Sequence, residues 1–141
     1  MIELVSDSSW EILGKHQIES EDSIVKVRQL IRQHAKDLSM GIIDQTRITT
    51  AVSELLRNMY NYANGGIVLI ESGMVDEKNA LIVTCMDEGS GIDDIELAMS
   101  DGYTSGQGMG FGLPGSKRLV DDFEIHSKKD VGTTVRVMKW K

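Results

Sequence analysis

The sequence contains little of the chemistry from which disulfides and metal sites are built. Cys85 is the only cysteine, and it lies in an apolar run at residues 81–86, where a buried, unreactive thiol is expected. The three histidines, His16, His34 and His126, are far apart in the chain. A metal site of the Cys/His kind is therefore not expected.

Basic residues are also in short supply. The 141 residues include 15 Lys and Arg against 22 Asp and Glu, which gives a net charge of −7 at pH 7. Nucleic acids and anionic membranes attract clustered Lys and Arg, so neither is expected as a partner. No apolar run approaches the roughly 20 residues of a membrane span, and the start of the chain lacks the features of a signal peptide. We therefore expect a cytoplasmic protein, with residues 1–141 forming a single domain.

Hydrophobic periodicity predicts strands and helices that alternate along the chain. Ser20 is the expected N-cap of the first helix, and Asp44 is that of the second helix, which should end at about Ala63. The expected elements are strands at residues 1–5 and 10–18, helices at 20–38 and 44–63, strands at 66–72 and 80–86 joined by a loop at 73–79, a helix at about 112–120, and strands at 123–127 and 133–139. This order leaves little room for parallel crossovers. It predicts an α/β two-layer sandwich, with a mixed, mostly antiparallel sheet and helices on one face.

Glycine is concentrated in one part of the chain. More than half of the 14 glycines lie between Asp87 and Lys117. Such a density is typical of backbone that approaches a ligand closely or adopts positive φ. The stretch begins with a D-x-G-x-G turn directly after an apolar run. It ends with four glycines in alternation, Gly106, Gly108, Gly110 and Gly112.

The alternating glycines lead into a predicted helix. Pro114, the only proline, suits the first turn of a helix that begins near Gly112. A glycine-rich loop before a helix presents free backbone N–H groups to an anion, most often a phosphate. The stretch contains no G-K-[ST], which excludes a Walker A loop, and it does not open the unit that a dinucleotide fingerprint requires. The glycines alone also leave open a flexible surface loop.

The second predicted helix carries a polar seam beside its buried face. Glu54, Asn58 and Asn61 line one edge of the apolar stripe, so that a carboxylate and a carboxamide lie one helical turn apart. The seam becomes a candidate site only if a polar partner lies above it. The glycine-rich stretch is the natural candidate for that partner.

The first predicted helix carries a basic face on an otherwise acidic protein. Lys26, Arg28 and Arg32 lie mostly away from its apolar stripe. Such a face is either an ordinary solvated helix surface or a docking face for an acidic partner. The sequence leaves both interpretations open.

Four segments resemble the nucleotide-binding boxes of one ATPase superfamily. They are E-L-L-R-N at 54–58, D-E-G-S-G at 87–91, G-Q-G-M-G-F-G-L at 106–113 and G-T-T at 132–134. Their order and spacing are similar to the N, G1, G2 and G3 boxes of the Bergerat-fold (GHKL) ATPases and kinases. Within that superfamily, DQTRITTAVSELLRN, GLPGSKRLVDDFEI and the terminal VMKWK are most similar to the bacterial anti-sigma-factor serine kinases, in particular the switch kinase of the stressosome.

The resemblance implies a role for each box. Asp87 would accept a hydrogen bond from the exocyclic amine of adenine, with Thr133 close to the same pocket. Glu54 would be the general base that takes the proton from a serine hydroxyl, and Asn58 would be a ligand of Mg²⁺. The other nucleotide-binding positions would be Gly89 and Gly91 at the base, and Gly106, Gly108, Gly110, Gly112 and Leu113 at the phosphates.

The resemblance also implies an activity, a protein-serine kinase that uses ATP and Mg²⁺ and takes part in partner switching. Such a kinase phosphorylates a STAS-domain antagonist protein on serine and, when released, binds and activates a phosphatase-type regulator. No Lys or Arg occurs from residue 92 to residue 116, which predicts slow transfer. One alternative is a nucleotide-sensing binding module with little phosphotransfer, although the presence of both Glu54 and Asn58 favours the kinase. A histidine-kinase catalytic domain is a third interpretation, which the absence of dimerisation helices disfavours.

Overall fold

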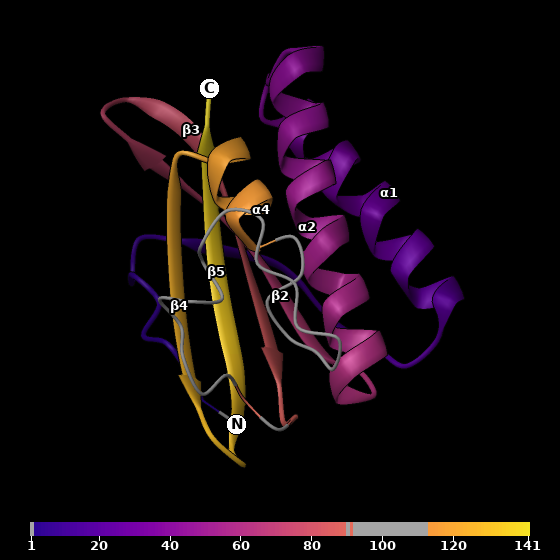
Figure 1. Cartoon of the computed structure of the whole chain (residues 1–141). Helices are drawn as coiled ribbons and strands as arrows, with labels where there is room; N and C mark the ends of the chain where they lie inside the picture. The colour runs from indigo at the N-terminus through magenta and orange to yellow at the C-terminus, as the bar shows by residue number, and fades with distance from the viewer. Residues whose placement is uncertain (1, 90, 92–112) are drawn as a thin grey trace.

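The computed structural model describes residues 2–89, 91 and 113–141, which form a sheet covered on one face by helices (Figure 1). The elements are strands β1 (Glu11–Ile18), β2 (Gly66–Val75), β3 (Lys78–Asp87), β4 (Asp122–Lys128) and β5 (Gly132–Trp140), and helices α1 (Glu21–Asp37), α2 (Ile42–Ala63) and α4 (Leu113–Leu119). The five strands have the order β1-β2-β3-β5-β4, and every strand pair described is antiparallel. The expected two-layer sandwich is confirmed, and its described sheet is antiparallel throughout.

Helix α1 begins where the sequence predicts. The Ser20 side chain accepts from the backbone N–H of Ser23, and the Ser23 hydroxyl accepts from the backbone N–H of Ser20, so that each satisfies a free donor. The acidic residues Glu21 and Asp22 occupy the first turn, where they interact favourably with the helix dipole. The helix buries one stripe against the core, at Ile24, Val27, Ile31 and Ala35.

The start of α2 differs from the sequence-based expectation. Its N-cap is Gly41, in an extended conformation, and Asp44 lies inside the first turn. The prediction that Asp44 caps the helix is therefore wrong. The Asp44 carboxylate lies 3.3 Å from Nζ of Lys139 on β5, a contact between residues that are far apart in the chain. The other end is as predicted, because Asn64 adopts the left-handed conformation at the C-cap with φ of 59°.

The connection between β2 and β3 is much tighter than the predicted loop at residues 73–79. The strands continue to Val75 and from Lys78, and Gly73 pairs with Ala80 within the ladder. Only Asp76 and Glu77 make the turn, and both have positive φ, 49° and 67°. A two-residue turn with positive φ at both positions matches the twist of an antiparallel pair, which explains why the strands extend so far.

Residues 2–10 contain no strand, so the strand predicted at residues 1–5 is wrong for the part that the structure describes. The backbone carbonyls of this segment instead bind side chains of β5. Arg136 donates from its two terminal nitrogens to the carbonyl oxygens of Val5 and Leu4, at 3.0 and 3.3 Å. Its guanidinium also lies 5.2 Å from the ring centre of Trp10. Because strand side chains alternate, Arg136 lies on the face away from the helices, and the N-terminal segment covers that face.

The core lies between the sheet and the helix layer. Strand residues Val68, Ile70, Leu81, Val83 and Val137 are fully buried in one cluster with side chains of α1 and α2. Alternate side chains of β2, β3, β4 and β5 face the helices, whereas β1 has a register shift between Ile12 and Gly14. None of the described helices is both long enough and apolar enough to cross a membrane.

Candidate functional site

Asp87 is the last residue of β3, and its carboxylate is almost completely buried. It follows Val83 and Cys85 on the face of the strand that packs against the helices, and only 4% of it is exposed. Its Oδ1 accepts two backbone hydrogen bonds, from the N–H of Gly89 at 2.9 Å and from the N–H of Thr133 at 3.2 Å. These bonds fix the carboxylate in one orientation at the end of the sheet.

Burial changes the protonation behaviour of two side chains here. Burial raises the pKa of Asp87 above its usual value of 3.8, and the hydrogen bonds from Gly89 and Thr133 oppose this increase. Burial, and to a smaller extent the nearby Asp87 charge, raises the pKa of Cys85 to about 12. The Cys85 thiol is therefore neutral at neutral pH, as the sequence predicts for an unreactive cysteine.

Three glycines let the backbone pack tightly around Asp87. A Cβ on Gly89 would lie 2.6 Å from the Cβ of Ala63 at the end of α2. Gly91 has φ of 77°, and a Cβ there would lie 2.3 Å from the carbonyl oxygen of Lys128. Gly132 has φ of 141°, and its Cβ would lie 2.1 Å from the carbonyl oxygen of Asp87. Side chains cannot replace hydrogen at these positions without moving the backbone that holds Asp87.

Thr133 is buried next to Asp87, and its hydroxyl has a partner that the sequence did not suggest. The two residues pair across β3 and β5, and Thr133 is 3% exposed. Its Oγ1 lies 2.8 Å from the hydroxyl of Ser127 on β4. Ser127 also donates to the carbonyl oxygen of Gly132 at 3.1 Å. Ser127 and Gly132 thus join Thr133 in one hydrogen-bonded cluster next to Asp87. Gly132 belongs to the G-T-T segment that the sequence analysis quoted, whereas no sequence pattern indicated Ser127.

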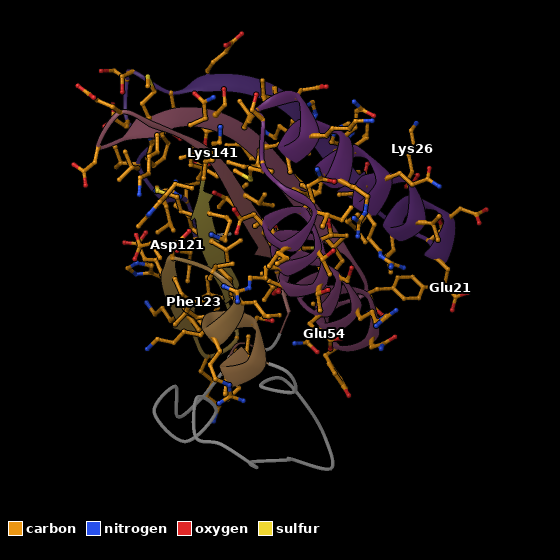
Figure 2. The ribbon with its side chains drawn as sticks, turned by 90° about the horizontal axis from the view of Figure 1, so that it is seen from above. Glu21, Lys26, Glu54, Asp121, Phe123 and Lys141 are labelled. Atoms are coloured by element: carbon orange, nitrogen blue, oxygen red, sulfur yellow. The ribbon has the colours of Figure 1, made fainter. Side chains whose placement is uncertain are left out.

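The polar seam of α2 divides into a buried and an exposed part. Asn58 is 8% exposed, whereas Asn61 is exposed to solvent. The Glu54 side chain is 39% exposed, and its Oε1 lies 3.4 Å from a terminal nitrogen of Arg57. Figure 2 shows Glu54 on α2 at the same edge of the molecule as α4. The seam therefore presents an accessible carboxylate one helical turn from a buried carboxamide.

Close packing brings the end of α2 next to the end of β3. Gly66 follows α2, and a Cβ there would lie 2.3 Å from the carbonyl oxygen of Met86 and 2.8 Å from the sulfur of Met59. Helix α4 joins the same layer, because the buried hydroxyl of Ser116 donates to the carbonyl oxygen of Ala51 at 3.3 Å. The residues predicted at the adenine and those predicted at the Mg²⁺ and the serine therefore lie on elements in direct contact.

The remaining predicted positions lie outside or at the margin of the described part of the chain. Leu113 is the first residue of α4, and its side chain is 3% exposed within the core. Within residues 2–89, 91 and 113–141, no group of three or more His, Cys, Asp or Glu could hold a metal ion. Gly106, Gly108, Gly110 and Gly112 lie outside the described residues.

Comparison with known proteins places the sequence in a family. Residues 43–141 match the family described as "Histidine kinase-, DNA gyrase B-, and HSP90-like ATPase". The serine/threonine-protein kinase RsbT of Bacillus subtilis is 46% identical over 124 residues, which cover 88% of this chain and 93% of RsbT. An anti-sigma F factor of Caldanaerobacter subterraneus is 33% identical over 138 residues, 92% of this chain and 90% of that protein.

Solved structures agree on the fold. The RsbU and RsbW domains of a Mycobacterium tuberculosis protein superpose with a TM-score of 0.59 at 17% identity, over 89% of this chain and 32% of that one. The catalytic domain of the histidine kinase ThkA gives a TM-score of 0.52, also at 17% identity, over 92% and 97% of the two chains. The predicted similarity to Bergerat-fold ATPases and to anti-sigma-factor kinases is confirmed by the family match and the sequence relatives.

Proposed function

Because the chain belongs to the family of histidine kinase-, DNA gyrase B- and HSP90-like ATPases, we propose that it binds ATP and transfers the γ-phosphate to a serine of another protein. The observation that carries this proposal is the carboxylate of Asp87. It is buried, fixed through Oδ1 by Gly89 and Thr133, and adjacent to the helix that carries Glu54 and Asn58. We propose residues 1–141 as one ATP-binding kinase domain.

The residues around Asp87 fit an adenine ring. Both described hydrogen bonds to the carboxylate use Oδ1, so Oδ2 is the oxygen that would accept from the exocyclic amine. Gly89 and Gly91 let the turn after β3 pack against Ala63 and Lys128, which holds the backbone of the proposed adenine pocket in place. Thr133 would lie beside the same ring, and Gly106, Gly108, Gly110, Gly112 and Leu113 would bind the phosphates through their backbone N–H groups.

The residues on α2 fit a magnesium ion and a serine substrate. Asn58 would supply a carbonyl oxygen to Mg²⁺, which prefers hard oxygen ligands, and the ion would neutralise charge on the phosphates. Glu54 would accept the proton of the serine hydroxyl as its oxygen attacks the γ-phosphate. The exposure of the Glu54 side chain supports this role, because the substrate hydroxyl must arrive on a second protein.

The proposed substrate is a STAS-domain antagonist protein, and the proposed second partner is a phosphatase-type regulator. The names of the relatives support this choice, since one is a serine/threonine-protein kinase and others are anti-sigma factors. A phosphoserine adds about −1.5 to −2 charges, which an acidic kinase with a net charge of −7 would repel. Phosphorylation would thus release the first partner in the cytoplasm and free the kinase for the second.

The experiment that tests the proposal follows phosphate from ATP to a protein. The chain is incubated with γ-labelled ATP, Mg²⁺ and a candidate STAS-domain antagonist protein from the same organism, and the labelled residue is located by mass spectrometry. Wild-type protein should label one serine, and Glu54→Gln should bind ATP normally but transfer about 10²–10⁴ times more slowly. Binding of ATP and partner without any labelling by wild type would leave a nucleotide-sensing binding module instead.

A further inference from the structure

The groove between α1 and α2 contains two buried polar atoms that lack a hydrogen-bond partner in the described part of the chain. They are Nε of Arg28 and Oγ1 of Thr49. Thr49 is only 5% exposed, so its hydroxyl cannot rely on bulk water. Both residues line one cavity of about 210 Å³. Buried donors and acceptors are nearly always paired with protein groups or ordered water, so a polar ligand or a water molecule in this groove would gain two hydrogen-bond partners.

The cavity continues along the groove. A second cavity, of about 390 Å³, shares Arg28 and Val25 with the first and is also lined by Ile24 and Tyr60. Val25 is 48% exposed, although it is a large apolar side chain on a helix surface. The groove therefore offers apolar contact area along with polar groups, as is typical of a surface that binds a peptide segment.

The charge of the groove is opposite to that of the whole chain. Arg28, Arg32 and Arg57 line the two cavities, and Glu21 is the acidic residue among their lining residues. The full chain carries a net charge of −7. A cluster of arginines on an acidic protein favours an anionic partner, and the planar guanidinium group suits a carboxylate.

We propose that the α1–α2 groove is the docking site for an acidic segment of the protein partner. A partner Asp or Glu side chain would accept hydrogen bonds from Arg28 and from the hydroxyl of Thr49, and a neighbouring apolar residue would pack on Val25. Because Nε of Arg28 and Oγ1 of Thr49 are both buried, the Arg28 side chain would move aside as the partner carboxylate enters. This inference rests on the proposed function, since it states how the substrate of the kinase is held.

The position of the groove suits a substrate. Arg57 lines the larger cavity, and its guanidinium lies 3.4 Å from the Glu54 carboxylate. A segment bound in the groove is thus one side chain away from the proposed base, and a serine of the same partner can reach it. Lys26 lines neither of these two cavities, and Figure 2 shows it on the side of α1 away from α2. It is the matched control for Arg28, because the same helix carries the same charge outside the groove.

The first experiment tests the chemistry of the groove without any need for phosphotransfer. The ¹H–¹⁵N resonances of the protein, including Arg28 Nε–H, are recorded during titration with a blocked peptide of alternating Asp and Leu. We expect shifts at Arg28 and Thr49, and no such shifts with a peptide of alternating Lys and Leu. Equal shifts with both peptides, or none with either, would overturn the proposal. Stronger binding of inorganic phosphate than of the acidic peptide would also overturn it, in favour of a simple anion site.

The second experiment measures binding of the STAS-domain protein to variants. Arg28→Met removes a charged donor and should weaken binding about 10- to 100-fold, and Thr49→Val should weaken it about fivefold. Thr49→Val removes a hydroxyl that has no hydrogen-bond partner among the described residues, so it should fold as well as wild type. Lys26→Met should stay within about twofold of wild type, and ATP affinity should be unchanged in all three variants.

The outcomes separate this inference from the proposed function. Wild-type partner binding by Arg28→Met and Thr49→Val would move the docking site elsewhere, even if phosphotransfer is observed. An equal loss in Lys26→Met would show a general charge effect and would likewise overturn the specific groove. If wild type transfers no phosphate but the variants lose binding as expected, the docking site stands and the kinase assignment fails.

Discussion

The carboxylate of Asp87 accepts a hydrogen bond from the backbone N–H of Thr133, 46 residues further along the chain, at 3.2 Å. The N–H of Gly89 binds the same Oδ1 at 2.9 Å. The first bond links the ends of β3 and β5, and the second closes the turn that follows β3. Both of these bonds use Oδ1, so the proposed contact with adenine falls to Oδ2, and substitutions of Asp87 can test it.

Asp87→Asn should weaken ATP binding and preserve the fold. The amide oxygen can take the place of Oδ1 and keep both backbone bonds, which puts the amide N–H₂ group where Oδ2 was. A donor would then face the adenine amine, and an unpaired buried polar group costs roughly 1–3 kcal/mol. Calorimetry should show about a five- to hundredfold loss of affinity. An unchanged affinity would remove Asp87 from the nucleotide site.

The same variant should change how stability depends on pH. Burial raises the pKa of Asp87 above 3.8, so the protonated carboxyl favours the folded state. This stabilisation is complete below the pKa of the unfolded chain and is lost as the pH rises through the pKa of the folded protein. The stability of Asp87→Asn relative to wild type should therefore increase as the pH rises above about 4. Denaturant unfolding at several pH values measures this difference.

Asp7→Asn provides a control of opposite sign. The pKa of exposed Asp7 is lowered by hydrogen bonds from the side chain and the backbone of Ser9. The ionised Asp7 favours the folded state, and this contribution is lost as the pH falls. The stability of Asp7→Asn relative to wild type should thus decrease slightly with rising pH. A parallel change in both variants would mean that neither trend comes from the substituted carboxylate.

Asn58→Ala should reduce the part of ATP binding that depends on Mg²⁺. The substitution removes the proposed oxygen ligand, whereas Asn58→Asp keeps one and should retain more of the binding. Asn61→Ala is the control, since Asn61 is exposed on the same helix. The measurement is ATP affinity with and without Mg²⁺. Equal Mg²⁺ dependence in wild type and Asn58→Ala would contradict the assignment.

Gly132→Ala should lower both stability and ATP affinity. Its φ of 141° disfavours any other residue, and a Cβ would lie 2.1 Å from the carbonyl oxygen of Asp87. The expected loss is about 1–3 kcal/mol, the usual cost of a residue held in such backbone conformations. Gly115 lies in α4, and a Cβ there would have no atom of the described residues within 4 Å, so Gly115→Ala should stabilise the protein by up to about 1 kcal/mol. Thermal unfolding compares the two, and equal melting temperatures would show that the contact at Gly132 relaxes freely.

Lys139→Met should destabilise the fold without acting on the nucleotide site. The Lys139 ammonium is buried and lies 2.7 Å from the Asp121 carboxylate and 3.3 Å from that of Asp44. Removing the ammonium group leaves the partly buried carboxylates of Asp44 and Asp121 without their cationic partner, which should lower the free energy of unfolding by about 3 kcal/mol. Lys141→Met, at the exposed end of the chain, should change little. Chemical denaturation measures both variants, and a Lys139→Met protein as stable as wild type would show that methionine packing offsets the lost ion pairs.

The sequence alone determined the features that depend on neighbouring residues. The Ser20 cap, the buried stripe of α1, the left-handed Asn64 at the end of α2 and the closing hairpin β4–β5 follow from patterns within a few residues. The four segments that resemble the N, G1, G2 and G3 boxes likewise identified the family, because their order and spacing can be read directly from the sequence. Local preferences and spacing can be read without knowing which segments meet.

Only the tertiary structure decided the features that join distant segments. Asp44 contacts Lys139 and does not cap α2, and residues 2–10 form no strand because their carbonyls bind side chains of β5. The basic face of α1 was also left open by the sequence. Packing against α2 gives the basic residues of α1 different surroundings. Arg28 lines a groove together with Thr49, whereas Lys26 lies outside that groove. Burial and unsatisfied hydrogen bonds depend on contacts between residues far apart in the chain, so they arise only when the helices pack.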